Sequence, residues 1–216
     1  MADIIMTAKI YLIGGGEIRN HETHEIDEDL KSLAPAGSSF VFLGFAAQDS
    51  KGYADTITTA FSDKFEVLVP TEEKGREYAI TALEAASIVY LGGGDADLLL
   101  ELFAKWNLLE HLTAALERGV HVAGMSAGAQ ALSSWYVREE NGKIEMRKGW
   151  GIIPVSVLVH ATQDSFKKAE SSWSTLANVQ KYPLMAIGER AAWRVDAQHQ
   201  RQVGPGIIWK SSNSEN

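Results

Sequence analysis

Ser126 stands between two glycines in the segment 124–128 (GMSAG), an arrangement that could expose a serine hydroxyl for nucleophilic attack. The spacing matches G-x-S-x-G, in which a sharp turn between a strand and a helix lifts the serine above a sheet. The turn would leave the amide of Ala127 at a helix N-terminus, where it can stabilise an oxyanion. A second amide would come from the turn at Gly93 and Gly94. The alternative is an ordinary N-cap serine, which the start of a helix also favours.

A nucleophilic serine needs a general base, and the base needs a group that orients it. His160 is the favoured base because it ends the strand-like run 155–160, so that it lies at a strand end as the serine does. Glu189 follows the apolar run 184–187 and is the favoured orienting carboxylate. Asp196, after the next predicted strand, is the competing carboxylate.

The other five histidines have simpler interpretations. His121 lies inside a predicted strand and is expected to be packed, His111 lies on a helix, and His199 lies in a polar turn. His21 and His24 are three residues apart, whereas the zinc motif H-E-x-x-H needs a separation of four. We therefore expect a solvated loop there and no metal site.

Two further glycine turns, 14–16 and 92–94, raise the alternative of nucleotide binding. Neither completes G-x-G-x-x-G, because Arg19 and Asp97 stand where the third glycine belongs. Asp95 also follows the second turn at once, and a carboxylate at a helix N-terminus occupies the place where a phosphate would bind. A tight strand-to-helix turn that only glycine tolerates is the competing interpretation.

Short apolar runs alternate with amphipathic runs along the first part of the chain. Their continuous Val, Ile, Leu and Phe character is typical of strands covered on both faces, and we expect strands at 9–13, 39–45, 65–69, 87–91 and 120–123. Helical spacing is present at 27–33, 53–64, 76–86 and 95–118, the last broken near 106–107. This alternation predicts an α/β fold, a three-layer α/β/α sandwich with a mostly parallel sheet. Later strands are expected at 155–160, 184–187, 192–195 and 207–209, with a helix at 165–179.

The composition indicates an ordinary globular protein, with 45% hydrophobic and 22% charged residues in 216. A net charge of −8 argues against nucleic acid or an anionic membrane as a partner. The absence of cysteine excludes disulfides, thiolate metal sites and a cysteine nucleophile. With no signal peptide or membrane span in the sequence, we expect a cytoplasmic protein. We expect one domain over 1–216, with 211–216 as a frayed polar tail.

The motifs together resemble the peptidase E and cyanophycinase family of serine peptidases, from about residue 9 to about residue 195. The most specific are the triple-glycine turn after a strand and the G-x-S-A-G-A elbow. The motifs that recur in this order are GGGEI (14–18), GY (52–53), IVYLGGG (88–94), GMSAGA (124–129), IIP (152–154) ahead of the histidine, and AIGERAA (186–192).

The resemblance implies a fold like that of class I glutamine amidotransferases, which is flavodoxin-like, with serine in place of their cysteine. It implies a triad of Ser126 as nucleophile, His160 as general base and Glu189 as orienting group. The oxyanion hole would then comprise the Gly93 and Gly94 turn and Ala127, as the spacing also suggests. The order serine, histidine, acid differs from that of α/β-hydrolases, in which the acid precedes the histidine.

Two departures from the family pattern concern the substrate. His160 stands in a Val-His-Ala triplet, whereas relatives usually have Pro-His-aromatic. The helix that follows offers Lys167 and Lys168 where relatives carry arginines, and lysine lacks the planar fork that binds a carboxylate through two hydrogen bonds. Asp95 and Lys167 are our candidates for substrate binding, and strict Asp-X specificity is left open.

We therefore predict a serine hydrolase that cleaves a small peptide or isopeptide of Asp-X or β-Asp-X type without metal or cofactor. Two alternatives remain: a non-catalytic binding member of the same fold, and a nucleotide-binding protein. The sequence does not decide whether the chain forms a homodimer.

Overall fold

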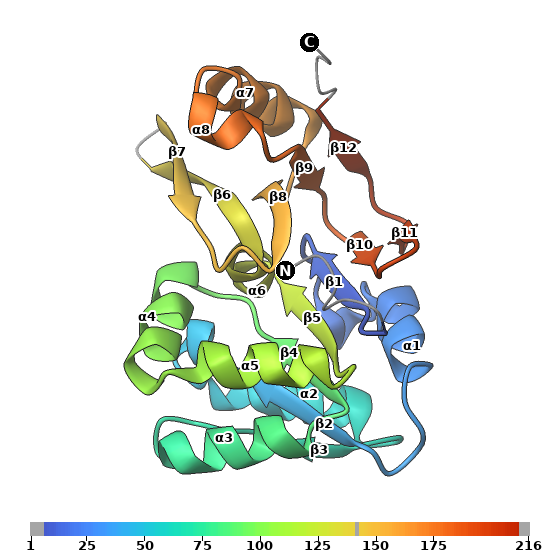
Figure 1. Ribbon diagram of the computed structural model, residues 1–216. Coiled ribbons are helices and arrows are strands. Elements are labelled where there is room, and N and C mark those ends of the chain that lie inside the picture. The colour runs from blue at the N-terminus through green and yellow to red at the C-terminus, as the bar shows by residue number, and fades with distance from the viewer. Residues whose placement is uncertain (1–6, 141–142, 212–216) are drawn as a thin grey trace.

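The computed structural model describes residues 7–140 and 143–211, and its larger sheet has seven strands in the order β11-β10-β1-β5-β4-β2-β3 (Figure 1). Strands β1 to β5 run parallel, β10 pairs antiparallel with β1, and β11 pairs antiparallel with β10. The expectation of a mostly parallel α/β fold is confirmed. The strands are β1 (Ile10–Ile13), β2 (Ser39–Leu43), β3 (Glu66–Leu68), β4 (Ile88–Leu91), β5 (His121–Met125), β10 (Ala192–Val195) and β11 (Gln200–Val203).

Helices cover both faces of this sheet because the central strands carry apolar side chains on both faces. In β1, Tyr11 and Ile13 pack into the layer of α1 and α2, whereas Ile10 and Leu12 pack into the layer of α3 to α6. The expected break near 106–107 is present, and Asn107 between α4 and α5 has a left-handed φ of 54°. The helices are α1 (His24–Lys31), α2 (Lys51–Phe61), α3 (Gly75–Ala85), α4 (Ala96–Trp106), α5 (Leu108–Glu117) and α6 (Ala127–Leu132), with 3₁₀ turns η1 (Ile18–Asn20) and η2 (Phe45–Ala47).

A second sheet of five strands, in the order β12-β9-β8-β6-β7, stands beside the carboxyl ends of β1 and β5 (Figure 1). One continuous apolar cluster contains residues of both sheets, among them Leu12 of β1 and Val157 of β8. The second sheet comprises β6 (Ser133–Glu140), β7 (Lys143–Lys148), β8 (Ile153–Leu158), β9 (Leu184–Ile187) and β12 (Ile208–Lys210), with α7 (Gln163–Trp173) and α8 (Ala177–Gln180) packed beside it.

The structure corrects three expectations in the last third of the chain. The helix expected at 165–179 is two helices, because α7 ends at Trp173 and α8 begins at Ala177. The expected later strands are present but belong to two different sheets, and neither the β6–β7 hairpin nor β11 was predicted. Ser211, expected in a frayed tail, is 3% exposed, and its hydroxyl accepts a hydrogen bond from the Leu184 amide. Residues 212–216 of that expected tail lie outside the described residues.

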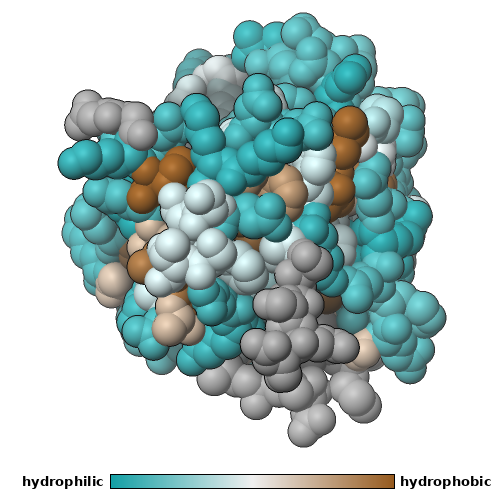
Figure 2. All heavy atoms as spheres, turned by 90° about the horizontal axis from the view of Figure 1, so that it is seen from above, coloured by the Kyte–Doolittle hydropathy of each residue, from teal (hydrophilic) through white to brown (hydrophobic). Residues whose placement is uncertain are grey.

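The described surface is mostly polar where it is seen from above. On the face shown in Figure 2, hydrophilic residues predominate and hydrophobic residues form small separate groups. Across the described residues, no helix has both the length and the apolar character needed to cross a membrane.

Asp27 of α1 is a carboxylate in an apolar layer. It is 7% exposed, and Thr23 Oγ1 donates to its Oδ2 at 2.8 Å. Its Oδ1 is buried and has no hydrogen-bond partner among the described residues. Burial raises the pKa of Asp27 to about 6, because the charged form loses its hydration.

We expect Asp27→Asn to stabilise the protein at neutral pH. The native state holds the Asp27 proton up to about pH 6, while the unfolded chain releases it near pH 4, so wild-type stability falls across that window. The neutral amide removes this loss, which amounts to about 3 kcal/mol at neutral pH and to progressively less toward about pH 4. Urea unfolding of both proteins at the two pH values measures the difference. A difference independent of pH would contradict the assignment, and Asp55→Asn, at an exposed position on α2, serves as the control.

Candidate active site

The site is assembled at the carboxyl end of β1. The carbonyl oxygens of residues 13–15 accept hydrogen bonds, in order, from the amides of Ser126 at 2.9 Å, His160 at 3.0 Å and Arg190 at 3.0 Å. Ser126 follows β5, His160 lies two residues beyond β8, and Glu189 lies two residues beyond β9. Three consecutive peptide groups therefore hold the three segments that carry the predicted triad.

The structure brings the side chains of the three predicted residues together. Ser126 Oγ lies 2.7 Å from His160 Nε2, and His160 Nδ1 lies 2.5 Å from Glu189 Oε1. The imidazole and carboxylate are half exposed, at 50% and 54%. A serine, an imidazole and a carboxylate in series can activate the hydroxyl and fix the tautomer of the imidazole.

The backbone is strained at each of the three segments. Ser126 has φ 50° and ψ −104°, His160 has φ 51°, and Arg190 has φ 61°. Such positions in residues other than glycine cost about 1–3 kcal/mol each and persist only where the surroundings impose them. The hydrogen bonds to residues 13–15 impose them here, and strain of this kind is concentrated at functional sites.

Glycines at the site are required by close contacts. A Cβ on Gly124 would lie 2.4 Å from the carbonyl carbon of Gly128, so the elbow closes only with glycine there. A Cβ on Gly15 would lie 2.3 Å from Glu189 Oε2 and 2.5 Å from His160 Nδ1. The first glycine turn therefore makes room for the histidine–glutamate pair. This supports the tight-turn interpretation of residues 14–16 over nucleotide binding.

A cavity of about 410 Å³ opens beside Ser126 and His160, and Arg19 and Tyr53 are among its lining residues that sequence reasoning did not predict as site residues. Arg19 of η1 lines it, and its Nε and Nη2 donate to Thr56 Oγ1 at 3.3 Å and 3.0 Å. Within the described part of the chain, no carboxylate pairs with this guanidinium, and no other arginine or lysine lines the cavity. Glu17 also lines the cavity, but its Oε1 accepts from the Arg19 backbone amide at 3.2 Å.

A larger cavity of about 730 Å³ lies between α1 and α2 and shares Arg19 and Thr56 with the first. His21 and His24 line it. In residues 7–140 and 143–211 there is no group of three or more metal-ligating side chains placed to hold an ion.

The three amides predicted to form an oxyanion hole differ in their surroundings. Gly93 N donates to the Tyr53 hydroxyl oxygen at 3.1 Å. For Gly94 and Ala127, the hydrogen bonds of the described residues include no acceptor for either amide. Two of the three amides are thus free to bind a ligand oxygen, and the third is already engaged.

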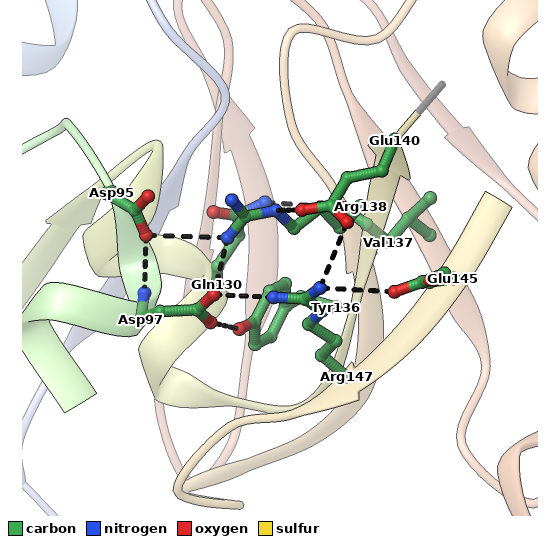
Figure 3. Close-up of polar contacts among 9 residues, drawn as sticks. All are labelled: Asp95, Asp97, Gln130, Tyr136, Val137, Arg138, Glu140, Glu145 and Arg147. Atoms are coloured by element: carbon green, nitrogen blue, oxygen red, sulfur yellow. Dashed lines mark hydrogen bonds and ion pairs between the residues drawn. The ribbon is translucent and has the colours of Figure 1, made fainter. Parts of the chain in front are cut away.

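The predicted substrate-binding residues Asp95 and Lys167 lie elsewhere. Asp95 caps α4 through the Asp97 amide at 2.8 Å and lies 3.4 Å from Arg138 (Figure 3). Arg138 and Arg147 both contact Asp97 Oδ2, at 2.6 Å and 2.5 Å, so these ion pairs connect the β6–β7 hairpin to α4. Lys167 is exposed on α7. Neither residue lines the cavity beside Ser126.

The competing carboxylate, that of Asp196, lies near the opposite end of β1 from Ser126. Asp196 follows Val195, which pairs with Ile10 at the start of β1, whereas Ser126 hydrogen-bonds to the end of β1. Asp196 Oδ1 accepts from the amides of Gln198 and His199.

The remaining histidines lie outside the site. His121 accepts from the Lys9 amide at 3.0 Å, and burial lowers its pKa. His111 lies 3.6 Å from Glu110, and His199 lies 3.7 Å from Asp196.

Comparisons with known proteins identify the family and the fold. The family model described as Peptidase family S51 matches residues 10–203. Uncharacterized peptidase YgaJ of Bacillus subtilis (strain 168) is 29% identical over 121 residues, which make up 55% of this chain and 53% of that protein. The match thus spans about half the length of that relative.

Two solved structures share the fold at low sequence identity. A peptidase from an acI-B1 Actinobacterium superposes with a TM-score of 0.67 at 19% identity, covering 98% of this chain and 96% of that one. A protein assigned to peptidase E from Listeria monocytogenes EGD-e gives 0.65 at 15% identity, covering 92% and 98%. At these identities the structures establish the fold, and the family model establishes the relationship: the chain belongs to peptidase family S51.

Proposed function

We propose that the chain is a serine peptidase that cleaves small peptides or isopeptides of Asp-X or β-Asp-X type with Ser126, His160 and Glu189. The observation that carries the proposal is the pair of hydrogen bonds in series, 2.7 Å from hydroxyl to imidazole and 2.5 Å from imidazole to carboxylate. Family membership supports the reaction class.

In the proposed mechanism His160 Nε2 takes the proton of Ser126 as its Oγ attacks the scissile carbonyl carbon. The Gly94 and Ala127 amides stabilise the resulting oxyanion. His160 then returns the proton to the leaving amine, and a water molecule attacks the acyl-enzyme by the same route. Glu189 accepts from Nδ1–H, which keeps Nε2 available as a base and stabilises the imidazolium.

Arg19 is our candidate for the group that recognises the substrate. It borders the same cavity as Ser126, and its hydrogen bonds within the described residues are to neutral oxygens of Thr56 and Gly52. A guanidinium held in this way can bind a carboxylate through two parallel hydrogen bonds. It therefore supplies the planar fork that Lys167 lacks, and the cavity of about 410 Å³ suits a small peptide with an acidic side chain.

The first test replaces the nucleophile. Ser126→Ala should lower hydrolysis of Asp-X or β-Asp-X dipeptides by about 10³-fold or more, because the attacking oxygen is lost. Its free energy of unfolding should change by at most about 1 kcal/mol, since alanine fits the same turn. Steady-state kinetics and urea unfolding measure the two quantities. Undiminished turnover in this variant would reject the hydrolase assignment.

The second test separates the two carboxylates. Glu189→Gln should lower kcat by about 10²-fold or more, because an amide cannot stabilise the imidazolium and can select the wrong tautomer. Asp196→Asn is the matched control, and its kcat should stay close to that of the wild type. If instead Asp196→Asn has the low kcat and Glu189→Gln has a kcat close to that of the wild type, the assignment of the third residue is wrong.

The third test concerns substrate selection. Arg19→Ala should raise KM for Asp-X by about 10-fold or more, because the substrate carboxylate loses a charged partner. KM for the uncharged Asn-X analogue should change little, so the preference for Asp-X falls. Arg19→Lys should restore only part of it, and Lys167→Ala should match the wild type. Equal effects of Arg19→Ala on both substrates would remove Arg19 from carboxylate recognition.

A further inference from the structure

The engaged amide of Gly93 points to a role for Tyr53 that rests on the proposed function. The Gly93 amide donates to the Tyr53 hydroxyl oxygen at 3.1 Å. A Cβ placed on Gly93 would lie 3.4 Å from the Ser126 Cβ, so this peptide group is adjacent to the proposed nucleophile. The carbonyl group of a substrate bound at Ser126 would therefore lie close to Gly93 and Tyr53. The Gly93 N–H itself points at the phenol oxygen.

Tyr53 is held rigidly at the wall of the cavity. It lies on α2, and its ring packs edge-on against Phe42 of β2, with 4.9 Å between the ring centroids. It borders the same cavity as Ser126 and His160. Because the ring and the Gly93 contact fix the phenol, its hydroxyl needs little reorganisation to meet a ligand, which is the condition for effective electrostatic stabilisation.

The Tyr53 hydroxyl is a donor at any pH at which the protein would work. Burial raises its pKa to about 12, although the Gly93 hydrogen bond opposes the shift. One lone pair of the oxygen accepts from Gly93, and in the described part of the chain no acceptor receives the phenolic proton. A phenol that accepts from an amide becomes a better donor through polarisation of its O–H bond.

We propose that Tyr53 donates a hydrogen bond to the oxyanion of the tetrahedral intermediate, with the Gly93 amide holding the phenol in place. When Ser126 Oγ bonds to the carbonyl carbon, the C=O π pair moves to oxygen and the serine proton moves to His160. Tyr53 keeps its proton and donates to that oxygen together with the free backbone amides. On collapse the C–N bond breaks, and its electron pair takes the proton from His160.

The opposite role is that Tyr53 masks Gly93 and competes with the substrate for its amide. The two roles predict opposite changes in turnover when the Tyr53 hydroxyl is removed. If Tyr53 donates, Tyr53→Phe loses a donor from the oxyanion hole. If Tyr53 masks, the same change frees the Gly93 amide and leaves turnover equal or faster.

The experiment compares Tyr53→Phe with wild type on the best Asp-X or β-Asp-X dipeptide and on the corresponding peptide aldehyde. The aldehyde forms a tetrahedral adduct with an active serine and so reports on oxyanion binding. We expect kcat to fall about 10²-fold with KM within about twofold, and aldehyde affinity to fall in parallel with kcat. Tyr90→Phe is the matched control, because its buried hydroxyl has no partner in the described residues and does not border the cavity. Its kcat should match the wild type.

Unchanged or faster turnover in Tyr53→Phe would overturn the proposal. A fall in kcat without a fall in aldehyde affinity would also overturn it, since a structural effect of Tyr53 need not act on the adduct. Thermal unfolding of the near-isosteric variant checks that the fold is kept. Failure of the proposed function has a different signature: wild-type protein would show no hydrolysis that Ser126→Ala removes.

Discussion

Three consecutive carbonyl groups at the end of β1 are the constraint on which the candidate site depends. Residues 13–15 accept hydrogen bonds from the amides of Ser126, His160 and Arg190. This single short segment fixes the relative positions of loops that are separated by 30 or more residues in the chain. It also sustains left-handed backbone at all three loops, which an isolated turn would relax. A small displacement of β1 would alter both hydrogen bonds of the triad at once.

Local sequence signals were sufficient for every strand of the larger sheet except β11, and for the three residues whose side chains meet at the candidate site. Continuous apolar runs predicted β1 to β5, because strands buried on both faces leave that pattern. Ser126 was marked by glycines whose missing side chains the elbow needs, and His160 and Glu189 by their places at strand ends. The prediction of one helix over 165–179 was wrong, because a short interruption between two helices leaves a weak signal in the sequence. The prediction that Ser211 is frayed was also wrong, because the burial of a single polar residue leaves a weak signal too. The β6–β7 strand pair was likewise not predicted, because its many polar side chains do not form an apolar run.

Contacts between distant segments could not be predicted in this way. Asp95 follows a glycine turn and could serve a substrate, yet Arg138 lies near it and also pairs with Asp97. Nothing close to Asp95 in the sequence indicates that the partner is an arginine of a later hairpin. Arg19 and Tyr53 reach the cavity from η1 and α2, which adjoin only after the chain folds. Their positions depend on side-chain packing, which leaves no periodic pattern in the sequence.

The residues of the proposed triad come from both sheets. Ser126 follows β5 of the larger sheet, whereas His160 and Glu189 follow β8 and β9, which are paired neighbours in the smaller sheet. During synthesis the residues of the serine elbow are made before the segment that carries His160, the proposed base. In the proposed mechanism the Ser126 hydroxyl would then lack its proton acceptor until β8 and β9 pair and their loops reach the end of β1. Under the proposed mechanism, the growing chain would therefore hold no activated serine until its last quarter is in place.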